Sequence, residues 1–275
     1  PGTGKSVVAI NLLVGLTQKT KLVQYVTKNA APRAVYASKL TGTIRRTQYD
    51  NLFKGSGAFV NTPANTFDVL VVDEAHRLND KSGMYANLGE NQVKEIIKSS
   101  RTSVFFIDED QRITLKDIGT KEEIRKWATL ARAEVKELEL ASQFRCNGSD
   151  GYLAWLDHAL QIRETANTSL NDIDYDFRIF SNPNEVLQLI KEKNLENNRA
   201  RMVAGYCWEW KSKNNPNLTD VIIPEQNFAM TWNLTKDGSL WIMSPDSVNE
   251  IGCIHTCQGL EVDYIGVIIG PDLIV

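Results

Sequence analysis

Residues 67–76 read Phe-Asp-Val-Leu-Val-Val-Asp-Glu-Ala-His, and this stretch decides the fold class. Its first six residues are apolar except for Asp68, a pattern typical of a buried parallel strand that is covered on both faces. Residues 103–107 form a second apolar run, which ends in the polar residues Asp108-Glu-Asp-Gln111. Two apolar runs that end in acidic residues predict strands whose carboxyl ends form a ligand site.

Helical and strand-like segments alternate around these two runs, and residues 41–66 are assigned to no element. This alternation predicts an α/β fold with mainly parallel sheets. The pattern restarts after residue 147, so we expect two domains, residues 1–147 and residues 148–275. The expected helices are 7–16, 32–40, 121–133, 149–162 and 182–194, and the expected strands are 22–27, 67–72, 103–107, 135–140, 176–180, 199–204, 239–243 and 264–269.

The composition limits the classes of protein to consider. The chain has 275 residues, of which 42% are hydrophobic, and this is enough for two domains with sizeable cores. It has no apolar run long enough to span a membrane, and its four cysteines show no paired spacing, so we expect a cytoplasmic protein. The net charge of −3 argues against a strongly basic module, and any contact with nucleic acid would need a local basic patch.

The chain opens with Pro1-Gly-Thr-Gly-Lys-Ser6, which matches the end of the phosphate-binding motif G-x-x-x-x-G-K-[ST]. The first glycine of that motif would precede Pro1, so we expect the chain to be a fragment. Gly2 and Gly4, on either side of Thr3, allow a tight turn whose N–H groups face phosphate oxygens. Lys5 would then reach the β- and γ-phosphates, and the Ser6 hydroxyl would bind Mg²⁺. The alternative is a glycine-rich helix cap without a ligand.

Asp73 and Glu74 directly follow the apolar run of residues 67–72. Hydrolysis of a nucleoside triphosphate requires one carboxylate that holds Mg²⁺ and a second that orients or deprotonates the attacking water. Asp73 fits the first role and Glu74 the second, whereas the alternative is a solvated turn. The sequence therefore predicts ATP and Mg²⁺ as cofactors.

The order of these motifs resembles that of superfamily 1 helicases over nearly the whole chain. Residues 73–76 resemble motif II, and Phe106-Ile-Asp-Glu-Asp-Gln111 resembles motif III. Leu140-Ala-Ser-Gln-Phe-Arg145 resembles motif IV, and Ile254-His-Thr-Cys-Gln-Gly-Leu-Glu261 resembles motif V. Residues 23–40 lie where motif Ia is expected. The resemblance implies two tandem RecA-like domains.

The same resemblance implies roles for individual residues. Gln111 and Arg145 would contact the γ-phosphate, and Phe144 would stack on the base. Gln258, Gly259 and Glu261 would face the nucleotide. His255 and Thr256 would lie toward nucleic acid.

More closely, the chain is similar to a bacterial family grouped with the helicase-like C-terminal part of Schlafen proteins. This similarity lies in three stretches of sequence: Val71-Val-Asp-Glu-Ala-His-Arg-Leu78, Ser142-Gln-Phe-Arg-Cys-Asn-Gly148 and residues 254–261. The adenine-contacting glutamine motif and motif VI of superfamily 1 have no match in the chain, which is consistent with a fragment that lacks both ends.

Several residues allow more than one interpretation. Arg45 and Arg46 could contact phosphates or form a solvated face, and both remain open. Trp208 and Trp210 could stack bases, but packing is favoured. His76 is expected to hydrogen-bond across the site toward motif III. A zinc site at Cys253, His255 and Cys257, which would share one face of a strand, is disfavoured because only three ligands are local.

The sequence therefore predicts an ATP-hydrolysing motor core that acts on single-stranded or duplex nucleic acid, with no membrane contact, as a monomer. The alternative is an ATP-gated clamp that binds nucleic acid or a protein without separating strands. A ring-forming, protein-remodelling ATPase is a third and weaker hypothesis.

Overall fold

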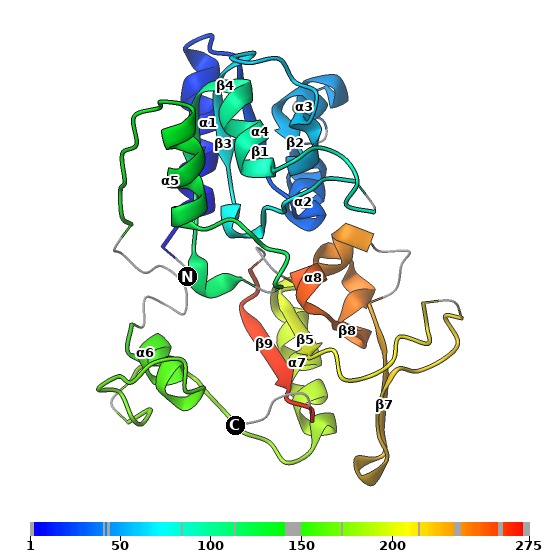
Figure 1. Cartoon of the computed structure of the whole chain (residues 1–275). Coiled ribbons are helices and arrows are strands. Elements are labelled where there is room, and N and C mark those ends of the chain that lie inside the picture. Colours follow the sequence, from blue (N-terminus) through cyan, green and yellow to red (C-terminus); the bar gives the residue numbers. More distant parts are fainter. Residues whose placement is uncertain are drawn as a thin grey trace. The chain divides into compact units, whose positions relative to one another are not determined.

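The computed structural model describes residues 3–40, 42, 45–83, 85–112, 114–140, 150–171, 173–213, 215–233, 238–257 and 261–271, without the side chains of residues 254 and 255. The chain divides into two compact units (Figure 1). The first comprises Pro1–Asn29 and Leu40–Tyr175, and the second comprises Ala30–Lys39 and Asp176–Val275. The boundary predicted at residues 147 and 148 falls outside the described residues and stays a prediction.

Within the described residues, the first unit contains a sheet of four parallel strands in the order β2-β1-β3-β4. In the register of the sheet, Val26 lies beside Val72, and Val72 lies beside Phe105. The carboxyl ends of three strands therefore meet at one edge. The strands are β1 (Val23–Val26), β2 (Phe53–Lys54), β3 (Phe67–Val72) and β4 (Ser100–Phe105).

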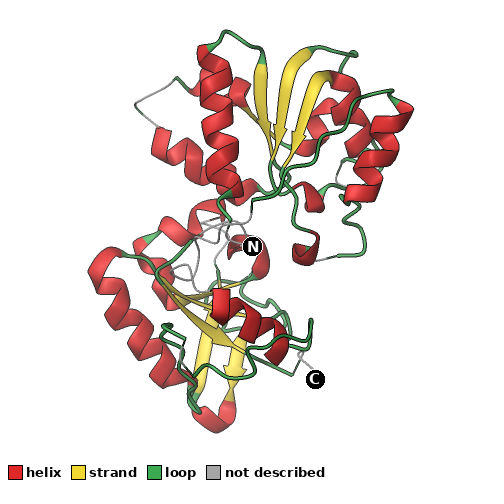
Figure 2. Ribbon diagram, turned by 90° about the vertical axis from the view of Figure 1, so that its left-hand side faces the viewer, coloured by secondary structure: helices red, strands yellow, loops and turns green. Residues whose placement is uncertain are grey.

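Helices flank this sheet (Figure 2). Among them, α1 packs against β1 and β3, and α4 packs against β4. Asn91 and Thr120 cap α4 and α5 by accepting hydrogen bonds from backbone N–H groups in the first turn. The helices of this unit are α1 (Lys5–Gln18), α3 (Arg46–Leu52), α4 (Gln92–Ser99), α5 (Lys121–Leu130) and α6 (Asp150–Ala159), with 3₁₀ turns η1 (Ser56–Phe59), η2 (Ala75–Arg77) and η3 (Glu109–Gln111).

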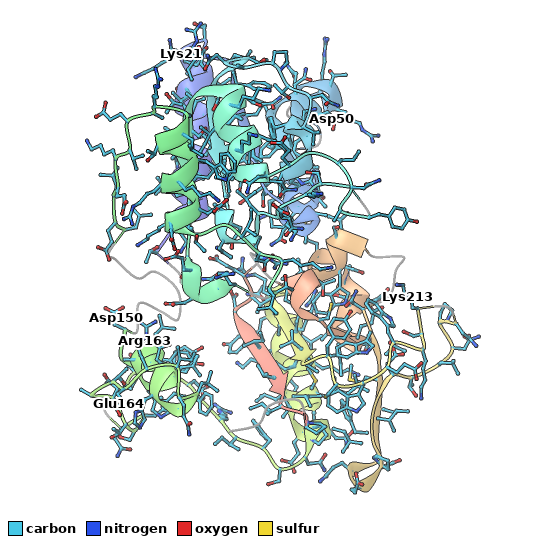
Figure 3. The ribbon with its side chains drawn as sticks, viewed as in Figure 1. Lys21, Asp50, Asp150, Arg163, Glu164 and Lys213 are labelled. Atoms are coloured by element: carbon cyan, nitrogen blue, oxygen red, sulfur yellow. The ribbon has the colours of Figure 1, made fainter. Side chains whose placement is uncertain are left out.

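The core of the first unit lies between β3 and the helices, around Leu70, Val72, Val93 and Ile96. Charged side chains such as Lys21 and Asp50 point away from this core (Figure 3). No helix in the described part of the chain is both long and apolar enough to span a membrane.

The sheet of the second unit has the order β6-β7-β8-β5-β9, and all of its pairs are parallel except that of β6 with β7. The mixed α/β fold with mainly parallel sheets is therefore confirmed. Its strands are β5 (Ala200–Ala204), β6 (Val221–Ile223), β7 (Phe228–Trp232), β8 (Glu250–Gly252) and β9 (Tyr264–Ile268).

The helix α7 (Pro183–Asn197) packs on β5 and β9, with Asn182 as its cap and Pro183 at its start. Trp208 and Trp210 pack against the core of this unit, as predicted. The remaining elements are α2 (Ala30–Leu40), α8 (Ile254–Cys257) and the 3₁₀ helices η5 (Pro224–Gln226), η6 (Gly238–Met243) and η7 (Pro245–Asn249).

Three predicted strands are wrong. Residues 135–140 and 176–180 belong to no strand and are mostly exposed, so their alternating apolar residues do not form the buried face of a strand. Residues 239–243 belong to η6 instead, in which Trp241 is buried. A half-buried strand needs alternating apolar residues, but such a pattern forms a strand only where a neighbouring strand pairs with it.

One buried arginine organises the second unit. Arg201 is 1% exposed, and among the described residues its guanidinium donates to uncharged acceptors alone. These acceptors include the side chain of Asn194 in α7 at 2.6 Å, the carbonyl oxygen of Ile242 at 2.8 Å and the hydroxyl of Ser247 at 2.8 Å. The side chain therefore ties α7, η6 and η7 to β5.

We expect the substitution Arg201→Ala to lower the free energy of unfolding by about 3–5 kcal/mol, because it leaves a cavity and several unpaired acceptors. Urea denaturation followed by tryptophan fluorescence measures this. The control is Arg199→Ala, since Arg199 is half exposed and paired with Asp263 at 2.9 Å, and its loss should cost about 0–1 kcal/mol. Equal, small losses for the two variants would contradict the role assigned to Arg201.

Candidate functional site

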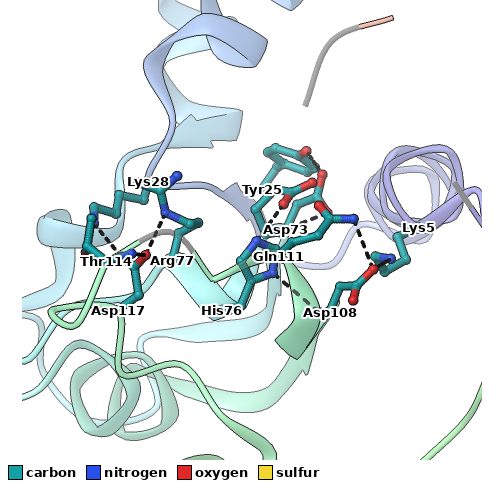
Figure 4. Close-up of polar contacts among 11 residues, drawn as sticks. Lys5, Tyr25, Lys28, Asp73, His76, Arg77, Asp108, Gln111, Thr114 and Asp117 are labelled. Carbon is teal, nitrogen blue, oxygen red and sulfur yellow. Dashed lines mark hydrogen bonds and ion pairs between the residues drawn. The ribbon is translucent and has the colours of Figure 1, made fainter. Parts of the chain in front are cut away.

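The candidate site lies at the carboxyl edge of the first sheet, where α1 begins. Gly4 precedes α1 with a backbone φ of 76°, a left-handed conformation that glycine adopts without strain. The next residue, Lys5, places its Nζ atom 3.0 Å from Oδ2 of Asp108 (Figure 4). Gln111 in η3 donates from Nε2 to the same carboxylate oxygen at 3.0 Å. Donors from α1 and η3 therefore share one acceptor, which lies in the segment after β4.

Asp73 follows β3 and is 4% exposed. The Tyr25 hydroxyl donates to its Oδ2 atom at 2.5 Å, and the backbone N–H of Glu74 donates to Oδ1 at 3.0 Å. Burial raises the pKa of the Asp73 carboxyl, and hydrogen bonds from Tyr25 and from the Ser6 side chain oppose that rise. The carboxylate is thus held in a dry position directly beside the start of α1.

Glu74 has a left-handed backbone with φ of 53°, which costs a residue with a side chain about 1–2 kcal/mol. The backbone on either side is fixed, because the N–H of Asp73 donates to the carbonyl of Val26 and that of Ala75 donates to the carbonyl of Phe106. This strained conformation directs Glu74 away from the line of the strand β3.

His76 connects this turn to the segment after β4. Its side chain is completely buried, and its Nδ1 atom accepts a hydrogen bond from the backbone N–H of Asp108 at 3.4 Å. On its other side, Nε2 lies 3.0 Å from Oε2 of Glu74. The predicted hydrogen bond between His76 and the residues that resemble motif III is therefore confirmed, with His76 as the acceptor.

A second buried carboxylate, Asp117, gathers cations from separate segments. Its Oδ1 atom lies 3.2 Å from Lys28 Nζ, and its Oδ2 atom lies 3.2 Å from Arg77 Nε (Figure 4). The guanidinium of Arg112 donates to the backbone carbonyl of Asp117 at 2.7 Å. Burial lowers the pKa of the Lys28 ammonium, an effect that Asp117 opposes. Asp117 therefore joins the end of β1, the turn η2 and the loop after η3.

Gly119 lets this loop approach η2 closely. A Cβ atom at residue 119 would lie 1.8 Å from the carbonyl oxygen of Ala75, which no side chain could tolerate. The N–H of Ile118 also donates to the carbonyl of Leu78 at 2.8 Å. The loop at residues 117–119 therefore supports the turn that carries Glu74 and His76.

The structure brings Lys5, Ser6, Asp73, Glu74 and Gln111 into one connected network, with Thr3 and Gly4 just before it. Tyr25, Asp108 and Asp117 were not predicted as site residues. Asp108 stands within the stretch that resembles motif III, which was the available signal. Tyr25 and Asp117 gave none, because their contacts join residues far apart in the chain.

Other predicted site residues lie outside the described residues: Gly2, Phe144, Arg145, Gln258, Gly259 and the side chain of His255. Glu261 is exposed and precedes β9 in the second unit, and its predicted contact with nucleotide stays a prediction. The Thr256 hydroxyl donates to the carbonyl of Cys253 at 2.9 Å and caps the turn of α8. Its predicted contact with nucleic acid is also untested.

Arg45 and Arg46 lie at the start of α3, and both are exposed. The Arg46 side chain is 94% exposed, and its Nε atom lies 3.9 Å from Asp50. A contact of this kind in solvent contributes little to stability, so it leaves the guanidinium accessible to a ligand.

The side chains that could hold a divalent cation in the first unit are Ser6 and Asp73, which contact each other. No group of three or more His, Cys, Asp or Glu side chains suited to a metal occurs among the described residues. Cys257 lies in the helix α8, so the strand geometry considered for Cys253, His255 and Cys257 does not apply.

The fold and site are those of an α/β protein in which a Gly-Lys-Ser helix start meets an acidic strand end. The chain belongs to the Schlafen group 3, DNA/RNA helicase domain family, whose family model matches residues 1–275. It is also similar to the uncharacterized protein YPL245W of Saccharomyces cerevisiae, with 24% identity over 237 residues. That alignment covers 75% of this chain and 49% of the yeast protein, so the chain spans about half the length of that relative.

We expect Asp117→Asn to lower the free energy of unfolding by about 3–5 kcal/mol, because Lys28 and Arg77 would lose their shared counter-ion. Thermal or urea unfolding measures this effect. Asp50→Asn is the matched control, since Asp50 is exposed and 3.9 Å from its partner, and it should change stability by less than about 1 kcal/mol. A stable Asp117→Asn protein would show that the cluster does not depend on charge pairing.

Proposed function

We propose that the protein is an ATP-binding and ATP-hydrolysing motor core of the superfamily 1 helicase type, with two RecA-like domains, acting on nucleic acid. The observation that carries this proposal is the convergence of Lys5, Ser6, Asp73 and Glu74 at one sheet edge. Membership of a family described as a DNA/RNA helicase domain supports the same proposal.

In this proposal the turn at Gly4 and the first N–H groups of α1 bind phosphate oxygens, because a helix start offers unpaired donors and a partial positive charge. Lys5 neutralises the β- and γ-phosphates. The Ser6 hydroxyl and the Asp73 carboxylate supply two adjacent oxygen ligands, which are the type that Mg²⁺ prefers. Bound Mg²⁺ would neutralise charge on the phosphates.

Glu74 would orient or deprotonate the attacking water. Its carboxylate lies 3.0 Å from His76, and His76 accepts a hydrogen bond from the backbone of the segment after β4. Gln111, from that same segment, would contact the γ-phosphate once it leaves Asp108. His76 thus gives a physical link between the hydrolytic carboxylate and the segment that senses the nucleotide.

Nucleic acid, single-stranded or duplex, is the proposed substrate of the motor. Arg45 and Arg46 on α3 are accessible cations that could contact its phosphates. Arg145 and Phe144, with Gln258, Gly259 and Glu261, complete the nucleotide site in this proposal, and His255 and Thr256 face nucleic acid.

The first test is ATP turnover with and without single-stranded DNA or RNA, for which stimulation is expected. Glu74→Gln should reduce turnover by about 10²–10⁴-fold while nucleotide binding is retained, because only the base is lost. The exposed Glu90 provides the control substitution Glu90→Gln, which should leave turnover unchanged. ATP turnover that nucleic acid does not stimulate would contradict the proposal of a nucleic-acid motor. Stimulated turnover without strand displacement on tailed duplexes would favour the clamp.

A pH dependence should follow from the buried Asp73. Burial raises its pKa, so the carboxyl keeps its proton to a higher pH than an ordinary aspartate does, and only the ionised form binds Mg²⁺. Mg²⁺-dependent nucleotide affinity should therefore fall as the pH is lowered, and the fall should begin at a higher pH than the ordinary pKa of an aspartate would give. Titration calorimetry at several pH values measures this. The variant Asp73→Asn should lose both the Mg²⁺ dependence and the pH dependence, and an unaltered profile in that variant would refute the assignment.

A further inference from the structure

Asp108 occupies the donors that the proposed function assigns to a phosphate. Its Oδ2 atom accepts from Lys5 Nζ and from Gln111 Nε2, each at 3.0 Å. The side chains of Lys5 and Asp108 are only 14% and 11% exposed, so solvent screens this ion pair weakly. Lys5 and Gln111 are both expected to reach the γ-phosphate.

Only the first of three consecutive acidic residues is placed in this way. Glu109 accepts the backbone N–H of Lys121 at 2.8 Å, and Asp110 pairs with Arg163 at 2.7 Å. Asp108 therefore faces Lys5 because of where β4 ends, and not because the segment is generally acidic.

A carboxylate and a phosphate are both negatively charged and repel each other. They therefore cannot bind the same partly buried donors at the same time. From this geometry we infer that the Asp108 carboxylate competes with the nucleotide phosphates for the donors of Lys5 and Gln111. It occupies both donors until a bound nucleotide displaces it. The inference rests on the proposed function, and it assigns a regulatory residue to that site.

The backbone of Asp108 is anchored separately from its carboxylate. Its backbone N–H stays bonded to His76 Nδ1, and His76 contacts Glu74. When the Asp108 carboxylate leaves Lys5 it also leaves Gln111, because Lys5 and Gln111 donate to the same oxygen of Asp108. Phosphate binding and the freeing of Gln111 are thus one event.

The test is the substitution Asp108→Asn, which keeps the size of the side chain and a hydrogen-bond acceptor for Gln111 but removes the charge. If Lys5 is free for about a tenth of the time in the native protein, the variant should bind a fluorescent ADP or ATP analogue about tenfold more tightly. A residue with a merely structural role would lose affinity when it is replaced, so a gain distinguishes the two. Unfolding curves show that the variant is folded, and Asp108→Ser provides a second variant without the carboxylate.

The control is Asp110→Asn, which makes the same change of charge two residues away on an exposed side chain. Its nucleotide affinity should match that of the native protein, and tightening in both variants would mean a general effect of charge and overturn the inference. Equal or weaker binding by Asp108→Asn and Asp108→Ser, with native binding intact, also overturns it. If neither the native protein nor the variants bind nucleotide, the proposed function itself fails.

Discussion

The burial of the Asp73 carboxylate at the end of β3 is the constraint on which the site depends. A carboxylate in this position is stable only if donors surround it, and the protein supplies them from three places: Tyr25 on β1, Ser6 on α1 and the N–H of Glu74. Meeting that requirement fixes the start of α1 against the sheet edge. It also forces the chain into the left-handed turn at Glu74, from which His76 reaches the segment after β4.

The parts of the site that could be predicted are those with a local signal. Gly4, Lys5 and Ser6 are adjacent in sequence, and Asp73 and Glu74 end an apolar strand, so each group was recognisable without knowledge of the fold. The contact of Lys5 with Asp108 spans more than a hundred residues, and it depends on which strands are neighbours. Strand order in a parallel sheet is set by tertiary packing, and the sequence does not state it locally.

The same reasoning explains the errors in secondary structure. Residues 135–140 and 176–180 carry the alternation of a strand, but they pair with no strand in the part of the chain that the structure describes. Residues 239–243 form η6 because Arg201 binds the carbonyl of Ile242 and Trp241 is buried. For residues 239–243, contacts with distant residues outweighed the local pattern. For the other two stretches, the described part of the chain lacks the pairing strand that the pattern requires.

Gly119 shows how far the site extends beyond the residues that would touch a ligand. Its backbone lies against the carbonyl of Ala75, within the turn that orients Glu74 and His76. The absence of a side chain there shapes the candidate site as much as its carboxylates do. A family member with a bulkier residue at this position would have to carry its acidic turn differently, even if every charged group of the site were preserved.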